Sequence, residues 1–206
     1  MTLLNPDLLA ALTLFAFVSS ITPGPNNTML MASGANFGLR ASAPHMAGVT
    51  VGFVVLLLAV GLGLGGLFAA FPWLHEALAA VGALYLLWLA WKIATSTGLG
   101  LKAAGARPQT FLQAAAFQWV NPKAWAMALG AMTAYAPQEN YVFNVVVVAA
   151  VFAAVNLPCV LCWTGFGVGL RRFLDRPAVL RAFNLAMAAM LVISLIPTLL
   201  SLVGAG

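Results

Sequence analysis

The stretch LLAALTLFAFVSSITPGPNNTMLMASGANF, residues 8–37, decides the fold, because it carries no charge and is interrupted near its middle by two prolines. A helix needs roughly 20 apolar residues to cross the hydrocarbon core of a bilayer, and this stretch is longer than that. The whole chain has the same character, since 63% of its 206 residues are hydrophobic, only 6% are charged and its mean hydropathy is +1.02. Soluble domains carry about a quarter charged residues, so the sequence predicts an integral membrane protein.

Further uncharged stretches follow along the chain at residues 46–73, 77–91, 110–122, 141–170 and 182–206. Together with the first stretch they predict an all-α membrane protein with six transmembrane helices, short loops and a single domain over residues 1–206. The N-terminus lacks the basic segment that opens a secretory signal, so we expect the first span to be retained.

Basic residues mark alternate connections between these stretches. Every Lys and Arg apart from Lys123 lies in the first, third or fifth connection: Arg40, Lys92, Lys102, Arg107, Arg171, Arg172, Arg176 and Arg181. The second and fourth connections carry Glu76 and Glu139 instead. Cytoplasmic loops are enriched in Lys and Arg, so we expect both termini outside the cell. Orientation thus explains the net charge of +5 better than a nucleic-acid partner, and we expect no such partner.

The chain also resembles two related halves, approximately residues 1–104 and 105–206. The first expected span contains T-P-G-P-N at residues 22–26, and the fourth contains N-P-K at residues 121–123. The second and fifth spans both end in alternating glycines: Gly61, Gly63, Gly65 and Gly165, Gly167, Gly169. Three spans per half is an odd number, so the halves must be inverted repeats. The glycines suit either packing within one chain or the contact face of a homodimer.

Pro23, Gly24 and Pro25 should break the first helix, because proline lacks an N–H and clashes with the preceding turn. Pro122 should break the fourth helix in the same way. Open backbone at membrane depth is tolerated only where protein groups or a water-filled cavity satisfy it. A simple proline kink is the alternative, but two prolines followed by Asn26 are more disruption than a kink requires. Broken helices in two inverted halves predict a solute site near the midplane.

Lys123 is the most informative single residue. A cation near the bilayer centre costs from about 2.5 to more than 10 kcal/mol, so it is a functional candidate by default. It also follows Pro122 at a helix N-terminus, where the macrodipole is already positive. No Asp or Glu lies inside any expected span, so a ligand carboxylate is the expected partner. The alternative is that Lys123 reaches the membrane interface with its long side chain.

The two motifs and nearby amides give the expected substrate-binding set. Its members are Thr22, Pro23, Gly24, Pro25, Asn26, Gln118, Asn121, Pro122, Lys123 and Asn156. A ligand ammonium would be held by carbonyls near residues 20–22 and by the amide oxygens of Asn26, Asn121 or Asn156. Hydrogen bonding between helices remains an alternative role for these amides.

The absence of a buried acid predicts a neutral substrate, since a cationic side chain would find no counter-charge. His45 is then the candidate for proton coupling, although a histidine at a helix entrance is also an ordinary interfacial residue. We expect no cofactor and no metal. Cys159 and Cys162 form a C-x-x-C that suits a redox or metal pair, but small residues one turn apart more often serve packing.

The segments ITPGPNNTMLMASGANFGLR (residues 21–40), PHMAGVTVGF (44–53) and FQWVNPKAWAMAL (117–129) resemble the LysE/RhtB family of amino-acid exporters. WLAWKIATS at residues 88–96 is similar to members that export cysteine and O-acetylserine, in the branch that also holds homoserine and threonine exporters. The resemblance implies six helices in the bacterial inner membrane, surrounded by lipid; the outward termini expected from the charge pattern would then be periplasmic. It also implies efflux of amino acids in exchange for protons, with no enzymatic reaction.

Three other classes compete with this interpretation. A membrane thiol-disulfide electron carrier needs a cysteine from each half, whereas both cysteines here lie in the fifth stretch. An intramembrane enzyme is disfavoured because paired carboxylates and the H-E-x-x-H motif are missing from the sequence. A passive channel for small polar solutes also suits a polar midplane, and flux against a gradient would distinguish it from a transporter.

Overall fold

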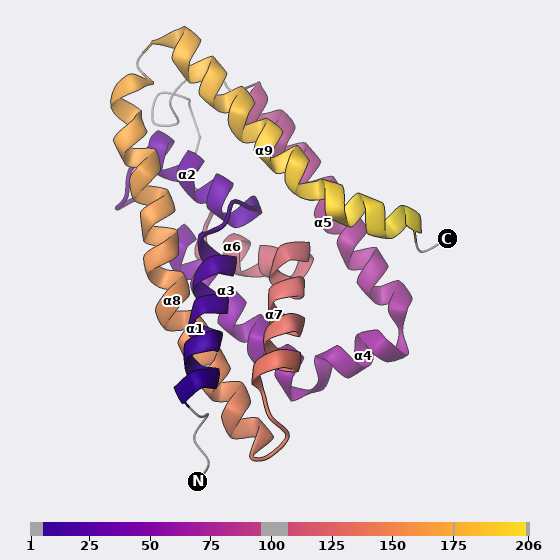
Figure 1. Ribbon diagram of the computed structural model, residues 1–206. Coiled ribbons are helices and arrows are strands. Elements are labelled where there is room, and N and C mark those ends of the chain that lie inside the picture. The colour runs from indigo at the N-terminus through magenta and orange to yellow at the C-terminus, as the bar shows by residue number, and fades with distance from the viewer. Residues whose placement is uncertain (1–5, 96–106, 175, 205–206) are drawn as a thin grey trace.

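The computed structural model describes residues 6–95, 107–174 and 176–204, and every regular element in these ranges is a helix (Figure 1). The elements are α1 (Pro6–Ile21), α2 (Pro25–Phe37), α3 (Ala43–Ala59), η1 (Val60–Leu64), α4 (Gly65–Ala70), α5 (Pro72–Ala94), α6 (Phe111–Phe117), η2 (Gln118–Val120), α7 (Pro122–Tyr135), α8 (Tyr141–Leu170), η3 (Arg171–Phe173) and α9 (Pro177–Gly204). The all-helical prediction is confirmed for this part of the chain. Lys102 and the expected boundary between the halves lie outside the described residues.

Helix length and composition identify the candidate membrane spans. Four stretches are long and apolar enough: Ala43–Leu64, Glu76–Ala94, Tyr141–Phe173 and Pro177–Ile196. α1 and α2 form a fifth candidate if they are one span, bent by 55° at the break between them. The region of the expected fourth span is divided among α6, η2 and α7, of which α7 is the longest with 14 residues. The chain is therefore a multi-pass membrane protein.

The expected second span is shorter than its apolar sequence. Residues 46–73 carry no charge, but the continuous helix ends at Leu64 and is followed by the separate helix α4. Gly63 has a φ of 125°, a backbone conformation that residues other than glycine rarely adopt, and this turns the chain. The uncharged stretch continues through this turn, so it is longer than the helix that it contains.

Prolines begin the helices that follow both breaks. α1 ends at Ile21, and α2 begins with Pro25 at its first position. In the second half α7 begins with Pro122, and the Oδ1 of Asn121 caps it by accepting a hydrogen bond from the backbone N–H of Lys123 at 3.2 Å. A proline at this position loses no helical hydrogen bond, because the first N–H groups have no partner within the helix. The breaks lie at the two motifs that were expected to contain them.

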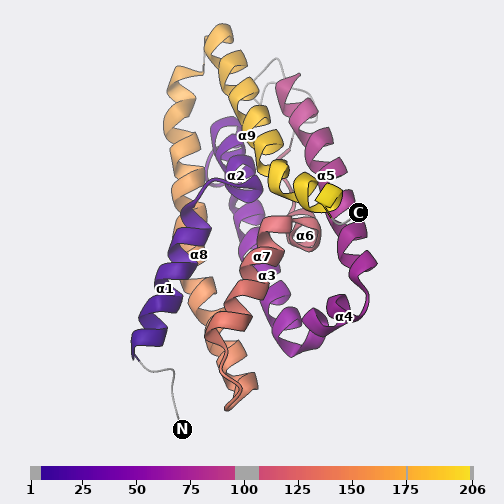
Figure 2. The same ribbon diagram turned by 45° about the vertical axis from the view of Figure 1, so that its right-hand side comes forward.

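α8 runs along one side of the molecule and packs against α1, α2 and α3 (Figures 1 and 2). α5 and α9 lie side by side in both views and form a second layer that contacts α2 and η2. α3 also packs against α6. The main apolar core lies between α1, α3, α7 and α8, with Phe152 of α8 fully buried at its centre.

Glycines allow α2 and α8 to approach closely. A side chain at Gly34 would collide with the backbone carbonyl of Thr164, and one at Gly167 would collide with the backbone of α2. Gly165 and Gly169 point away from this contact, and nothing lies within 4 Å of where their Cβ atoms would be. Gly167 therefore serves packing within the chain, whereas Gly165 and Gly169 lie on the outer surface.

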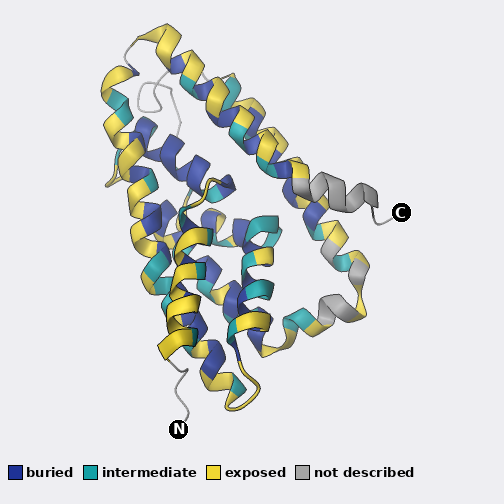
Figure 3. Cartoon of the chain, in the orientation of Figure 1, coloured by how far each residue is buried: buried dark blue, intermediate teal, exposed yellow. Residues whose placement is uncertain are grey.

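The outer surface is apolar, as a lipid-facing surface requires. Figure 3 shows that exposed residues cover the outward sides of the helices, while buried residues face the interior of the bundle. Large apolar side chains are among the exposed ones, including Leu84 at 67% and Leu112 at 75% exposure. A soluble protein rarely exposes such extended apolar areas, so hydrocarbon rather than water is the solvent for these faces.

Candidate functional site

Lys123 bridges the two helix breaks. Its Nζ donates hydrogen bonds to the carbonyl oxygen of Thr22 at 2.8 Å, to the Oγ1 of Thr22 at 3.0 Å and to the carbonyl oxygen of Pro23 at 3.2 Å. An ammonium has three N–H donors, and each has an acceptor here. The acceptors lie just beyond the C-terminal end of α1, where the helix dipole is negative and favours a cation. The sequence predicts a ligand carboxylate as the partner of Lys123, whereas in the structure these neutral oxygens take that place.

The neighbouring carbonyls of α1 also have side-chain donors. Asn27 Nδ2 donates to the carbonyl oxygens of Ser20 at 2.7 Å and Thr22 at 2.8 Å. Trp163 Nε1, from α8, donates to the carbonyl oxygen of Ile21 at 3.0 Å. The carbonyls near residues 20–22, which the sequence analysis assigned to a ligand ammonium, are thus occupied by the protein in this conformation. Neither Asn27 nor Trp163 was among the expected site residues.

Gly24 provides the space in which Lys123 lies. A Cβ atom at Gly24 would be 2.7 Å from Cδ of Lys123 and 3.1 Å from its Nζ. The backbone of Gly24 is extended, with a φ of 179°, so the requirement at this position is for space and not for an unusual conformation. Gly24 directly precedes α2 and Lys123 lies in the first turn of α7, so their close approach brings the two helix breaks together.

Asn26 and Gln118 bind each other. Asn26 Nδ2 donates to Gln118 Oε1 at 2.8 Å, and Gln118 Nε2 donates back to Asn26 Oδ1 at 3.1 Å and to the carbonyl oxygen of Ala114 at 2.9 Å. Gln118 has no exposed surface. This reciprocal amide pair joins the first turn of α2 to the start of η2, so the two helix breaks are connected a second time.

Asn156 of α8 contacts the site through longer hydrogen bonds. Its Nδ2 donates to Ser20 Oγ at 3.4 Å, and its Oδ1 accepts from Thr50 Oγ1 at 3.3 Å. Hydrogen bonds of this length are near the outer limit, so these partners are more easily exchanged than those of Asn27. Asn156 is 8% exposed, and that exposed part faces the cavity described next.

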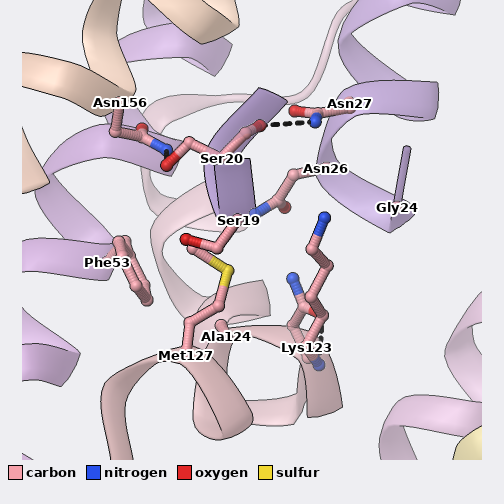
Figure 4. Close-up of a pocket in the computed structure, with 11 residues that line it drawn as sticks. Ser19, Ser20, Gly24, Asn26, Asn27, Phe53, Lys123, Ala124, Met127 and Asn156 are labelled. Atoms are coloured by element: carbon pink, nitrogen blue, oxygen red, sulfur yellow. Dashed lines mark hydrogen bonds between the residues drawn. The ribbon is translucent and has the colours of Figure 1, made fainter. Parts of the chain in front are cut away.

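A small cavity lies between the two breaks (Figure 4). The centre of a water molecule can occupy about 30 Å³ of it, which is room for water but not for an amino acid. Its lining residues are Ser19, Ser20, Gly24, Asn26, Asn27, Phe53, Asn121, Lys123, Ala124, Met127 and Asn156. None of these residues is acidic, and the polar ones come mainly from the ends of α1, α2 and α7.

The cavity collects part of the expected substrate-binding set. Gly24, Asn26, Asn121, Lys123 and Asn156 line it. The other expected residues do not line the cavity. They hydrogen-bond to residues that do, or begin the helices that carry them: Thr22, Pro23, Pro25, Gln118 and Pro122. Ser19, Ser20, Asn27, Phe53, Ala124 and Met127 were not expected. Ser19, Ser20 and Asn27 flank the first motif in sequence, whereas Phe53, Ala124 and Met127 have apolar side chains that give no signal in an apolar chain.

His45 and the two cysteines lie apart from the cavity lining. His45, in the first turn of α3, is 2% exposed, and neither of its ring nitrogens has a hydrogen-bond partner among the described residues. Burying an imidazole without hydrogen-bond partners costs free energy. A histidine at the membrane interface would instead have water as a partner. Cys159 is buried and Cys162 is exposed, and both are free thiols. No group of His, Cys, Asp and Glu in the described ranges has the arrangement of a metal site.

A bundle of apolar helices in which two broken segments meet around a polar cavity defines a multi-pass membrane transport protein. The family model of the LysE type translocators matches residues 17–195, and the chain belongs to this family. Membership in a family of translocators places the chain among transport proteins.

Relatives of this chain carry a more specific description. The cysteine/O-acetylserine efflux protein of Escherichia coli (strain K12) is 33% identical over 193 residues, which cover 92% of this chain and 96% of the relative. The protein of the same description from Shigella sonnei (strain Ss046) is similar to the same extent, and that of Escherichia coli O1:K1 / APEC is 32% identical. No solved structure matches the chain.

Proposed function

We propose that this protein exports small neutral amino acids across the bacterial inner membrane. Membership in the LysE type translocators supports transport, and relatives described as cysteine/O-acetylserine efflux proteins support an amino-acid substrate. The observation that carries the proposal is the position of Lys123, whose ammonium lies at the edge of a polar cavity and is held by neutral oxygens alone. A site of this kind attracts a carboxylate.

The substrate carboxylate binds at the end of the cavity where α2 begins. Gly24 precedes the first turn of α2, and no side chain caps this helix N-terminus. The partial positive charge of the helix end and the ammonium of Lys123 therefore act on the same region. A carboxylate competes with the oxygens of Thr22 and Pro23 for Lys123, and it forms the stronger, charge-assisted hydrogen bonds.

The substrate ammonium binds at the opposite, oxygen-rich side of the cavity. The hydroxyls of Ser19 and Ser20 and the Oδ1 of Asn156 are acceptors on this side of the lining. They are uncharged, which suits one ammonium that is already paired with its own carboxylate. A second cationic group, as in lysine or arginine, would have no acidic partner in this lining. The set therefore favours neutral amino acids.

The transport domain, residues 1–206, is proposed to have six spans in two inverted halves, with α6, η2 and α7 as the broken fourth span. If the two halves are related by symmetry, α1 corresponds to α6 and α8 corresponds to α3. The contact between α1 and α8 then corresponds to the contact between α6 and α3, and both pairs pack closely. Prolines begin both α2 and α7, at Pro25 and Pro122, and Lys123 of the second break packs against Gly24 of the first. This arrangement supports a pseudo-two-fold axis at the cavity.

Export is proposed to be coupled to proton entry through His45. No carboxylate lines the cavity, so an acidic proton carrier is missing from the described site. His45 is buried in α3 with both ring nitrogens unpartnered, which leaves one lone pair free to take up a proton. Gly48 and Gly52 of the same helix pack closely against α6, so a charge at His45 would act next to the broken second half.

The test is efflux of a panel of amino acids from bacterial cells loaded with dipeptides, at matched membrane levels of protein. Lys123→Ala should abolish export of neutral amino acids, because the carboxylate loses its only cationic partner in the lining. Lys92→Ala is the control, since Lys92 is exposed and lies over the ring of Trp88 at the end of α5. If no amino acid leaves through the wild-type protein, the proposed function is wrong. If Lys123→Ala still exports, the site is wrong.

Two further readouts separate the competing classes. Export that continues against a concentration gradient and stops with an uncoupler excludes a passive channel. Export that survives when Cys159 and Cys162 are both replaced by serine excludes a thiol-disulfide carrier.

A further inference from the structure

We propose that Met127 and Phe53 form the subsite for the substrate side chain and set the upper limit on its size. This inference rests on the proposed function, because it assumes that the cavity binds an amino acid. It adds the part of the substrate that Lys123 and the helix ends do not contact. Figure 4 shows Lys123 and Phe53 on opposite sides of the cavity, with Met127 rising from α7 between them.

The geometry of α7 fixes the distance between the carboxylate and the side-chain subsite. Lys123 and Met127 are four residues apart on one helix, so they lie on the same face, about one turn or 5–6 Å apart. Ala124 lies next to this face and also lines the cavity. A substrate with its carboxylate at Lys123 therefore directs its Cα and the first atoms of its side chain over Ala124 toward Met127.

Phe53 closes the far side of this path as a rigid wall. It belongs to α3, is 3% exposed and packs edge-on against Phe152, with 5.5 Å between the ring centroids. Phe152 packs in turn against Phe15 of α1, at 6.1 Å. Because Phe53 packs against the fully buried Phe152, which is itself held by Phe15, Phe53 cannot move aside for a larger substrate without disturbing the main core.

Met127 is the adjustable part of the subsite. Lys123 and Met127 are the only lining residues with long, flexible side chains; the others are small, amide or aromatic. The free space is now too small for an amino acid, so a substrate must displace side chains that can change rotamer. Lys123 moves to bind the carboxylate, and Met127 moves to admit the side chain. The space that Met127 can release is limited to its own volume, which restricts the substrate to small side chains.

The experiment compares export of alanine, cysteine and serine with that of leucine, methionine and phenylalanine, each loaded into cells as a dipeptide. Met127→Ala should raise the ratio of leucine to alanine export by roughly tenfold, the discrimination that one or two methylene groups provide in an apolar pocket. Phe53→Leu should raise it as well. Met127→Phe should restrict export to the smallest substrates.

Met132→Ala is the matched control. Met132 lies on α7, is buried at 6% exposure and contacts the core near Gly61 rather than the cavity. Its truncation removes the same atoms from the same helix and should leave the ratio unchanged. If the wild-type protein exports small amino acids and Met127→Ala gives the same ratio as Met132→Ala, the subsite assignment is wrong and the function stands. If the wild-type protein exports none of the six, the proposed function itself fails.

Discussion

Lys123 is bound in a way that a transport cycle can use. Its three partners are oxygens of Thr22 and Pro23, which are neutral, so the protein satisfies the ammonium without a permanent ion pair. A lysine paired with a buried carboxylate would be difficult to separate from it, since breaking such a pair leaves an uncompensated charge. A substrate carboxylate can instead exchange with the backbone oxygens and leave again.

Gly24→Ala tests this arrangement without changing any charge. The new Cβ would be 2.7 Å from Cδ of Lys123, so the lysine side chain must shift and give up its hydrogen bonds to Thr22 and Pro23. A substrate carboxylate would then lose a hydrogen bond to the displaced ammonium, which contributes about 1.5–3 kcal/mol and corresponds to roughly 10–100-fold. We expect amino-acid export to fall by roughly that factor while the amount of protein in the membrane stays similar.

Gly66→Ala is the control for this prediction, because nothing lies within 4 Å of the Cβ position at Gly66. If Gly24→Ala and Gly66→Ala export amino acids at the same rate, the contact between Gly24 and Lys123 is not needed for transport.

Sequence reasoning identified the residues of the site better than it identified their partners. Lys123 and the prolines were recognisable because a cation and missing N–H groups are costly in a bilayer. The carbonyls that bind Lys123 have no sequence signal, since every residue has one. Met127 and Phe53 were missed for the opposite reason: in a chain that is 63% hydrophobic, apolar residues that line a cavity look like any others.

At the scale of helices, glycines determine how closely α2 and α8 can pack. Gly167 must be a glycine because a side chain there would meet the backbone of α2, which cannot move aside as a side chain can. Gly167→Ala should therefore destabilise the protein by about 1–3 kcal/mol, the usual cost of overpacking. Gly165→Ala, on the open side of the same helix, should be neutral or stabilising by up to about 1 kcal/mol.

The measurement is thermal unfolding of both variants in the same detergent. Equal unfolding temperatures would contradict the role given to Gly167, whereas a lower value for Gly167→Ala alone would support it. The sequence could not show which of the three glycines in α8 packs against another helix, because they are evenly spaced. That depends on which side of α8 faces α2.

At the scale of the whole molecule, the first and fifth connections lie at the same end of the bundle. A side chain at Gly38, directly after α2, would be 3.7 Å from the guanidinium of Arg171, directly after α8. This contact agrees with the expectation that the basic loops share one side of the membrane, which the sequence predicted from the distribution of Lys and Arg alone. The charge pattern does not show how close the first and fifth connections are to each other, whereas the structure shows them in contact.

We predict that this end of the bundle faces the cytoplasm, with Gln138 between α7 and α8 on the periplasmic side. The test uses a variant in which Cys159 and Cys162 are replaced by serine and one exposed residue is changed to cysteine: Leu39, Phe173 or Gln138. A membrane-impermeant maleimide added to intact cells should label Gln138→Cys and leave Leu39→Cys and Phe173→Cys unlabelled until the inner membrane is permeabilised. The positive-inside rule requires this result, because Arg40 and Arg171 adjoin the two protected positions. Labelling of Leu39→Cys and Phe173→Cys in intact cells would invert the orientation, and labelling of only one of them would contradict the fold itself.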